Sequence, residues 1–202
     1  STKAAWGVEG LSAGTPIKPI KKVGVLGAGT MGGGISMNFA NVGIEVTIVE
    51  VQQAALERGL GVIRKNYQNS ADKGRFPQEE VGIRMGLLKG TLNRSDLADC
   101  DLIVEAVVER LDIKQSLCAE LEALVSPEAI LATNTSSLSV TAIAAKLKHP
   151  GRFAGYHFFN PVPLMKVVEV IAGLKTSAAV CTQLIDYARQ MGHTPVLAQD
   201  TP

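Results

Sequence analysis

The stretch that decides the fold reads Val23-Gly24-Val25-Leu26-Gly27-Ala28-Gly29-Thr30-Met31-Gly32. Its first four residues form a short apolar run, which is typical of a strand buried on both faces of a parallel sheet. The last six form a G-x-G-x-x-G string, and a helix over residues 30–42 is expected to follow and to end at Gly43. Strand, glycine turn and helix in this order are typical of the opening of a doubly wound α/β domain.

Outward from this stretch, strand-like and helix-like patterns alternate with short connections. The expected strands span residues 23–26, 45–50, 91–93, 101–106, 130–133, 153–157, 165–171 and 194–197. The expected helices span residues 30–42, 51–72, 112–125 and 177–191, with a shorter helix beginning near Pro77. This alternation predicts a Rossmann-type α/β fold, a doubly wound, mostly parallel sheet with helices on both faces.

Each glycine of the turn suits dinucleotide binding for a physical reason. Gly27 permits the tight turn, Gly29 lets the backbone approach a pyrophosphate, and Gly32 lets the helix pack close to the strand. The first N–H groups of the helix, around Thr30 and Met31, are free to donate hydrogen bonds to the phosphates, and the positive end of the helix dipole lies there. The string alone is a weak signal, but its context predicts a dinucleotide site while saying nothing of the substrate.

An acidic residue ends the second expected strand. Glu50 lies 18 residues after Gly32, about where such domains place the carboxylate that hydrogen-bonds the adenosine ribose. Residues 51–53 supply no arginine that could hold a 2′-phosphate. The pattern therefore favours NAD over NADP as the cofactor. The alternative is a glycine-rich turn without a ligand, beside a solvated Glu50.

A histidine and a glutamate stand on two neighbouring expected strands. Oxidation of an alcohol by hydride transfer needs a base for the hydroxyl proton, and histidine titrates near the working pH. A carboxylate fixes the tautomer of such an imidazole and stabilises its charged form. Glu169 lies among valines, where an unpaired charge is costly, so His157 is its expected partner. The alternatives are a structural histidine and a glutamate on a solvated strand face.

Taken together, these motifs resemble the NAD-binding domain of the 3-hydroxyacyl-CoA dehydrogenases of fatty-acid β-oxidation. The resemblance rests on Gly27-Ala28-Gly29-Thr30-Met31-Gly32, on Thr133-Asn134-Thr135-Ser136-Ser137-Leu138, and on His157-Phe158-Phe159-Asn160-Pro161 with Glu169 twelve residues after His157. It implies that His157 is the general base, that Glu169 orients it, and that Ser136 hydrogen-bonds the 3-oxygen of the substrate.

The resemblance also implies which further residues line the cofactor. They are Ala106, Glu109, Lys114, Asn134 and Asn160, the last on the nicotinamide side. For some of the site residues a purely structural role is the alternative. Ser136 and Ser137 could cap a helix near Ser139, and Lys114 could be an ordinary exposed lysine.

The activity implied is oxidation of (3S)-3-hydroxyacyl-CoA to 3-ketoacyl-CoA with reduction of NAD. Three other functions stay open. The chain could be a cofactor-binding module that does not turn over, a different NAD-dependent dehydrogenase for 3-hydroxy or sugar acids, or a structural protein that keeps the fold. The glycine turn and Glu50 suit all the dehydrogenases equally, whereas the His157–Glu169 pattern favours oxidation of 3-hydroxyacyl-CoA.

The expected domain organisation is a linker over residues 1–20 and an NAD-binding domain over residues 21–202. The segment from Leu11 to Lys22 resembles the linker of multifunctional enzymes that carry an enoyl-CoA hydratase part before the dehydrogenase. The resemblance also implies a helical C-terminal domain for substrate binding and dimerisation, which this chain lacks. We therefore expect an excised domain whose parent is dimeric or in a complex with a thiolase subunit.

Composition excludes several other functional classes. The formal net charge of +1 gives no basic surface for nucleic acid or for a membrane. No apolar run approaches the roughly 18 residues of a membrane span. Three separated cysteines, Cys100, Cys118 and Cys181, fit buried residues in a reducing compartment, and no metal site is expected. We expect a cytoplasmic protein if the source is bacterial, and a peroxisomal or mitochondrial one if it is eukaryotic.

Overall fold

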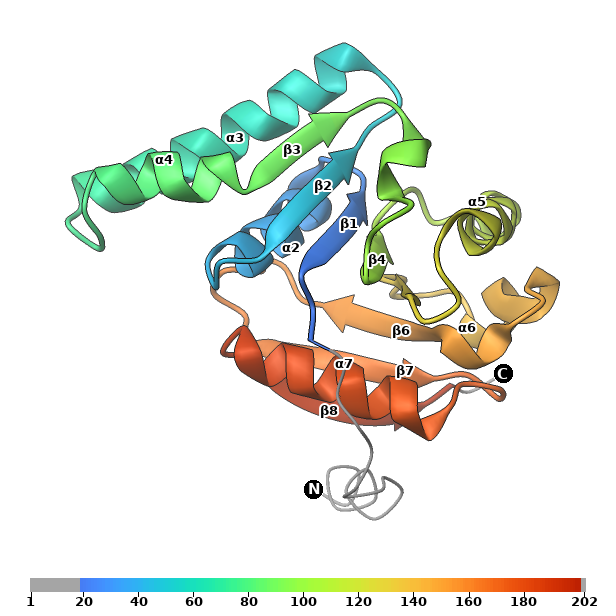
Figure 1. Cartoon of the computed structure of the whole chain (residues 1–202). Helices are drawn as coiled ribbons and strands as arrows, with labels where there is room; N and C mark the ends of the chain where they lie inside the picture. Colours follow the sequence, from blue (N-terminus) through green and yellow to red (C-terminus); the bar gives the residue numbers. More distant parts are fainter. Residues whose placement is uncertain (1–18, 201–202) are drawn as a thin grey trace.

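A computed structural model describes residues 19–200 and centres on one eight-stranded sheet (Figure 1). The strands are β1 (Lys22–Leu26), β2 (Glu45–Val49), β3 (Leu88–Thr91), β4 (Leu102–Glu105), β5 (Ile130–Thr133), β6 (Phe153–Phe158), β7 (Val167–Ala172) and β8 (Thr194–Gln199). Their order is β3-β2-β1-β4-β5-β6-β7-β8. Strands β1 to β6 are mutually parallel, whereas β7 is antiparallel to β6 and parallel to β8. The predicted doubly wound, mostly parallel sheet is therefore confirmed.

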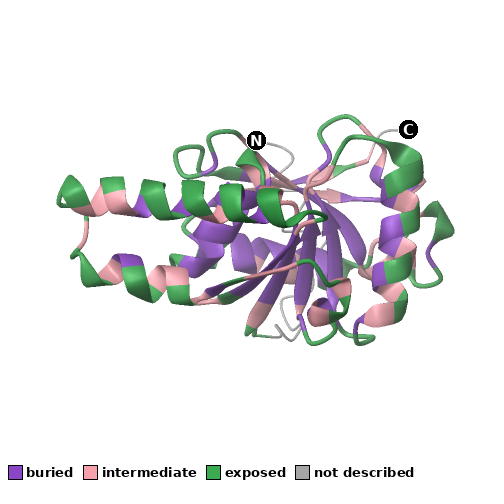
Figure 2. Ribbon diagram, turned by 90° about the horizontal axis from the view of Figure 1, so that it is seen from above, coloured by how far each residue is buried: buried purple, intermediate pink, exposed green. Residues whose placement is uncertain are grey.

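Helices cover both faces of this sheet (Figure 2). They are α2 (Thr30–Ala40), α3 (Gln53–Asp72), α4 (Glu79–Gly86), α5 (Leu111–Leu124), α6 (Val140–Ile143) and α7 (Ala178–Gln190), with short 3-10 turns η1 (Arg94–Leu97), η2 (Ala144–Lys146) and η3 (Pro150–Arg152). One apolar core lies under α2, α3, α4 and α7, and a second lies under α5, α6 and η1. Successive strand residues point to opposite faces, so Val25 enters the first core and Leu26 the second.

The functional edge of the sheet is set by the point where the strand order reverses. From β1 the chain winds outward through α2 to β2 and β3, and from β4 it winds the other way through α5. The connections after β1 and β4 lead to helices on opposite faces of the sheet, α2 over the first core and α5 over the second. Doubly wound sheets bind their ligands in the crevice at such a point. Because β1 to β6 are parallel, the residues that follow each of these strands reach this same edge.

Most predicted elements agree with the structure, and one strand is misplaced. Gly43 has a φ of +83° and follows α2 in a Schellman arrangement, in which the N–H of Ile44 donates to the carbonyl of Phe39. The strand expected over residues 91–93 is wrong, because β3 ends at Thr91. Asn93 instead starts η1, where its side chain accepts the N–H of Ser95, and this turn ends the ladder.

Several other expectations concern the chain as a whole. The linker predicted over residues 1–20 lies outside the described residues except for its last two. Within residues 19–200 no helix is long and apolar enough to cross a membrane, and no three His, Cys, Asp or Glu side chains are grouped to hold a metal ion. All three cysteines are buried as free thiols. Burial raises the pKa of Cys100 and of Cys118 to about 12, so neither thiol is reactive at neutral pH.

Candidate active site

The glycine turn joins β1 to α2 at the edge of the crevice. Gly27 has a φ of +107°, which favours glycine, and its N–H donates to the carbonyl of Val49 at 2.9 Å. The N-terminus of α2 has no side-chain cap. Thr30 is exposed and Met31 is half-buried at this end of the helix. The turn therefore offers the uncapped N–H groups that phosphate binding uses.

Two glycines of the turn differ in what surrounds them. A Cβ at Gly32 would lie 2.0 Å from the carbonyl oxygen of Gly27, so the protein itself requires glycine there. A Cβ at Gly29 would have no neighbour within 4 Å. Nothing in the described chain explains a glycine at position 29, whereas a pyrophosphate lying against the backbone does. The turn thus fits a dinucleotide.

Glu50 lies against this turn. One carboxylate oxygen accepts the N–H of Ala28 at 3.0 Å, and the other accepts the N–H of Val51 at 2.9 Å. The residue borders a cavity of about 670 Å³ shared with the turn, α3 and residues 160–164. It also borders a hollow of about 650 Å³ that reaches residues 92–95 and α5. A carboxylate in this position suits recognition of a ribose.

His157 and Glu169 face each other across β6 and β7. The antiparallel register pairs them directly, and His157 Nδ1 lies 3.0 Å from Glu169 Oε1. Their side chains are 17% and 31% exposed, so the pair is sheltered and still reachable from solvent. Since Nδ1 is bound to the carboxylate, Nε2 is the nitrogen left to exchange a proton with a substrate. The predicted pairing is present in the structure.

Asn134 connects the ends of three neighbouring strands. Its backbone N–H donates to the carbonyl of Glu105 at 3.0 Å, at the end of β4. Its side-chain oxygen accepts the N–H of Phe158 at 2.8 Å, next to His157. The side-chain oxygen of Asn134, a residue predicted to line the cofactor, is thus used within the protein and holds the end of β6.

Ser136 lies between two tethered neighbours. Thr135 and Ser137 both donate their hydroxyls to Glu109 Oε2, at 2.7 and 2.8 Å. Ser136 is exposed, and its hydroxyl has no hydrogen-bond partner within residues 19–200. The helix cap is Ser139, whose hydroxyl accepts the N–H at the third position of α6. Ser136 is therefore free to bind a ligand.

Lys114 is buried, so the interpretation of an ordinary exposed lysine is wrong. Its Nζ lies 2.7 and 2.8 Å from the two carboxylate oxygens of Glu105 and 3.0 Å from Glu109 Oε1. The side chain is 1% exposed. An ammonium has three protons, and these carboxylate contacts, with the carbonyl of Val107 at 3.4 Å, leave none of them unpaired. Lys114 therefore acts within the protein in this structure.

Glu109 is held in its ionised form by its neighbours. Partial burial acts to raise the pKa of Glu109, but hydrogen bonds from Thr135, Ser137 and Lys114 outweigh it and lower the pKa to about 2. The carboxylate is thus charged throughout the physiological range. Its side chain, 38% exposed, joins the start of α5 to the segment after β5.

Glu105 is a site residue that the sequence analysis missed. It ends β4, is 1% exposed, and accepts hydrogen bonds from Lys114, from the hydroxyl of Thr133 and from the N–H of Val107. Burial raises the pKa of its carboxyl, and Lys114 opposes this. The available signal was a carboxylate ending an apolar strand, where an unpaired charge is costly.

Ala106 directly follows β4, and Asn160 lies in the segment between β6 and β7. Ala106 donates its N–H to the carbonyl of Leu26 at 2.9 Å, and its own carbonyl lies against Gly27. Asn160 is exposed and lines the 670 Å³ cavity together with the glycine turn. The structure therefore gathers the predicted residues along one edge of the sheet.

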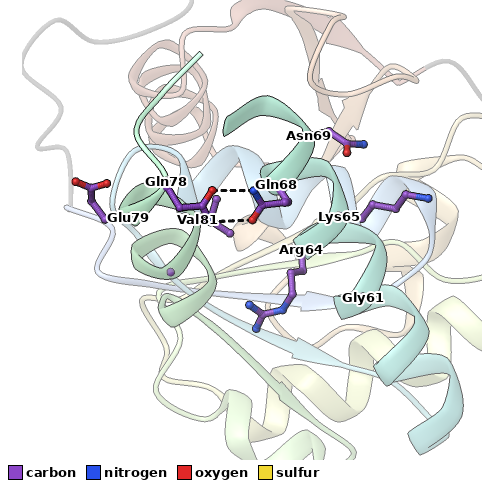
Figure 3. A pocket seen from close by; sticks show the side chains of 9 residues that line it. Gly61, Arg64, Lys65, Gln68, Asn69, Gln78, Glu79 and Val81 are labelled. Carbon is purple, nitrogen blue, oxygen red and sulfur yellow. Dashed lines mark hydrogen bonds between the residues drawn. The ribbon is translucent and has the colours of Figure 1, made fainter. Parts of the chain in front are cut away.

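A third hollow, of about 620 Å³, lies between α3 and α4, away from these residues (Figure 3). Gln68 and Gln78 span it through reciprocal amide hydrogen bonds of 2.7 and 2.8 Å. None of the predicted site residues lines this groove. The chemistry expected from the sequence thus belongs to the carboxyl edge of the sheet and to the cavities that border Glu50.

Comparison with known proteins identifies the family of this chain. The family described as 3-hydroxyacyl-CoA dehydrogenase, NAD binding domain, matches residues 22–201. A probable 3-hydroxybutyryl-CoA dehydrogenase of Deinococcus radiodurans is 43% identical over 181 residues, which are 90% of this chain and 65% of the relative. A fatty acid oxidation complex subunit alpha of Pseudomonas putida is 40% identical over 183 residues, 91% of this chain and 26% of the relative.

A solved structure of a 3-hydroxybutyryl-CoA dehydrogenase has the same fold as this chain. The 3-hydroxybutyryl-CoA dehydrogenase of Escherichia coli superposes with a TM-score of 0.90 at 39% identity, over 92% of this chain and 39% of that one. The chain thus spans less than two thirds of each of these relatives. Together the family match, the fold and the glycine turn show that the chain belongs to the 3-hydroxyacyl-CoA dehydrogenase family, as its NAD-binding domain.

Proposed function

We propose that the chain is the cofactor-binding part of an enzyme that oxidises (3S)-3-hydroxyacyl-CoA to 3-ketoacyl-CoA in fatty-acid β-oxidation. The observation that carries this proposal is the His157–Glu169 pair, 3.0 Å apart, on the sheet edge that also holds the glycine turn. A paired imidazole supplies the base that alcohol oxidation needs. The names of the relatives support the acyl-CoA substrate class.

Each side chain of the site has one task in this reaction. NAD, when bound, supplies the acceptor for the hydride that leaves C3 of the substrate. His157 Nε2 takes the hydroxyl proton, while Glu169 holds Nδ1 and stabilises the imidazolium. Ser136 donates its hydroxyl to the 3-oxygen, which polarises the carbonyl in the reverse direction. Asn160 contacts the nicotinamide side of the cofactor.

The cavity beside the turn suits the charged part of an acyl-CoA. Arg58, Lys73 and Arg75 all line it, and Asn66 and Asn69 add hydrogen-bonding groups. Three cations in the lining of one cavity match the phosphates of coenzyme A. The cavity is also bordered by Asn160 and by apolar residues of the segment up to Leu164. We infer that the substrate lies along α3 with its acyl end toward His157.

The test is oxidation of NADH with acetoacetyl-CoA, measured for the full-length protein and for residues 1–202, beside thermal unfolding with and without NADH. We expect turnover by the full-length protein. For residues 1–202 we expect stabilisation by NADH without turnover, since the relatives contain at least a further third of their length. Absence of NADH stabilisation in both proteins would refute the proposed cofactor role.

Replacement of Glu50 by alanine in the full-length protein is expected to lower NAD affinity by about 10- to 100-fold. The reason is the loss of charged hydrogen bonds to the ribose, worth roughly 1.5–3 kcal/mol. The same change removes the repulsion of a 2′-phosphate, so the NAD to NADP preference should shrink. The measurement is fluorescence titration with NADH and NADPH. Glu45→Ala, at the exposed start of β2, the strand that Glu50 follows, is the control, and an unaltered NAD to NADP ratio for Glu50→Ala would contradict the ribose role.

We further propose that residues 21–202 form the NAD-binding domain of a longer enzyme with a helical C-terminal domain for substrate binding and dimerisation. The relatives support this because the chain spans 65% of a 3-hydroxybutyryl-CoA dehydrogenase and 26% of a fatty acid oxidation complex subunit. A complex with a thiolase subunit is the partner proposed for the multifunctional case. Size-exclusion chromatography with light scattering on the full-length protein distinguishes a dimer from a larger assembly.

A further inference from the structure

The segment after β5 holds a free serine between two tethered residues. Thr135 and Ser137 are both bound to one oxygen of Glu109, whereas the Ser136 hydroxyl has no partner in the described chain. The N–H of Ser137 also approaches this oxygen, at 3.3 Å. The position of Ser136 therefore depends on where the Glu109 carboxylate lies.

Glu109 is held in turn by a buried ion pair. Its Oε1 lies 3.0 Å from Lys114 Nζ, and the same nitrogen is 2.7 and 2.8 Å from the two oxygens of Glu105. Lys114 and Glu105 are each 1% exposed, whereas Glu109 is 38% exposed. The buried pair thus anchors a carboxylate that reaches the surface of the site.

Glu105 also anchors the same segment from its other side. It accepts the hydroxyl of Thr133, and the Thr133 oxygen in turn accepts the N–H of Thr135 at 3.3 Å. The segment is thereby bound at both ends to one buried carboxylate, once through Thr133 and once through Lys114 and Glu109. No other side chain in the described residues makes both connections.

Stability alone does not account for this arrangement. A buried ion pair contributes little net stability, and apolar residues of similar volume often serve as well or better. What two carboxylates and one ammonium do provide is a fixed geometry, because an ammonium held by three oxygens has no free rotation. The effect of Glu105 should therefore appear where geometry matters most, at the reacting oxygen of the substrate.

We propose that Glu105 is a positioning residue that fixes the hydroxyl of Ser136 through Lys114 and Glu109. The inference rests on the proposed function for its kinetic consequence, since Ser136 is taken to bind the 3-oxygen. It does not require Glu105 to touch substrate or cofactor. A misplacement of about 1 Å can cost about 100-fold in rate, so a buried residue can govern turnover without any such contact.

The kinetic test is Glu105→Gln in the full-length protein, combined with Ser136→Ala in a double-mutant cycle. Glutamine keeps the shape but gives up the charge and one acceptor toward Lys114. We expect kcat with acetoacetyl-CoA and NADH to fall between about 10- and 100-fold, with KM and NADH affinity nearly unchanged. In the Ser136→Ala background the same change should have little further effect, because the residue acts through Ser136. Additive losses would overturn the proposal.

A structural readout separates this inference from the proposed function. Amide hydrogen exchange of residues 134–138 should become faster in Glu105→Gln, while exchange in α7 should not change. Glu122→Gln is the control, since Glu122 lies on α5 with Lys114, and its carboxylate accepts the N–H groups of Lys148 and His149, away from residues 134–138. Unchanged exchange at 134–138 in Glu105→Gln would overturn the positioning role. A wild-type protein without turnover would instead contradict the proposed function.

A second variant covers the case in which Glu105→Gln does not fold. Ser137→Ala removes one tether at its exposed end, and within residues 19–200 the Ser137 hydroxyl binds only Glu109. We expect a fall in kcat of a few fold, again absent in the Ser136→Ala background. Full activity of a folded Ser137→Ala protein together with unchanged exchange at 134–138 would overturn the proposal.

Discussion

Replacement of His157 by alanine in the full-length protein is expected to lower kcat with acetoacetyl-CoA and NADH by about 10²- to 10⁴-fold, the usual contribution of a general acid or base. The Nε2 nitrogen is the only part of the pair free to carry the reacting proton, because Nδ1 is 3.0 Å from Glu169. NADH affinity should change by no more than about twofold, since the proposed contacts to the pyrophosphate and the ribose come from the glycine turn and Glu50 and not from His157.

The measurements for this variant are steady-state kinetics and NADH titration. His149→Ala is the matched control, because His149 is exposed and its hydrogen bonds within the described residues, to Glu122 and from Arg152, are made by its backbone. Glu169→Gln should give a smaller loss than His157→Ala, since the base remains but loses its orienting charge. Wild-type turnover in His157→Ala would exclude this residue as the base.

The second large effect separates two glycines that lie three residues apart. Gly32→Ala is expected to destabilise the protein by more than about 3 kcal/mol, beyond ordinary overpacking, because its Cβ would lie 2.0 Å from a backbone oxygen that cannot move aside. Gly29→Ala should fold normally, since its Cβ meets no atom within 4 Å. It should nevertheless lower NADH affinity at least about tenfold, because the methyl group occupies the space of the pyrophosphate.

Thermal unfolding and NADH titration of both variants test this contrast. Gly61→Ala is the control, as it lies within α3 and its Cβ also meets nothing within 4 Å. If Gly29→Ala binds NADH as tightly as the wild type does, the pyrophosphate does not lie on this turn. If Gly32→Ala is as stable as the wild type, the packing of the turn against α2 is looser than the structure indicates.

The parts of the site that could be predicted are those with local signals. The glycine turn and Glu50 are spaced along one strand–helix–strand unit, so the sequence alone brings them together. The pairing of His157 with Glu169 could be predicted because Glu169 lies among valines in one expected strand, where its charge needs a partner, and His157 lies on the preceding expected strand. The hairpin register then sets them directly opposite each other. In each case the informative residues lie within one supersecondary unit.

The parts that could not be predicted depend on side chains that meet across the fold. Lys114 has the sequence surroundings of an ordinary helix residue, and only the placement of α5 over the end of β4 buries it against Glu105. Likewise, the oxygen of Asn134 meets the N–H of Phe158 because β5 and β6 are neighbours. The end of β3 was misplaced because Asn93 prefers to start a turn, a local preference that outweighed the β-branched Thr91 beside it.

The order of strands in this sheet has a consequence for how the site assembles during folding. His157 and Glu169 are twelve residues apart and meet in a hairpin, so little loop-closure entropy opposes their contact. The crevice needs β1 beside β4, and this pairing joins residues that are far apart in the sequence, such as Val23 and Leu102. Long-range parallel pairing of this kind is slow. During refolding, the proton-transferring pair should therefore form before the cofactor cleft does, and recovery of NADH binding should report the last strands to join.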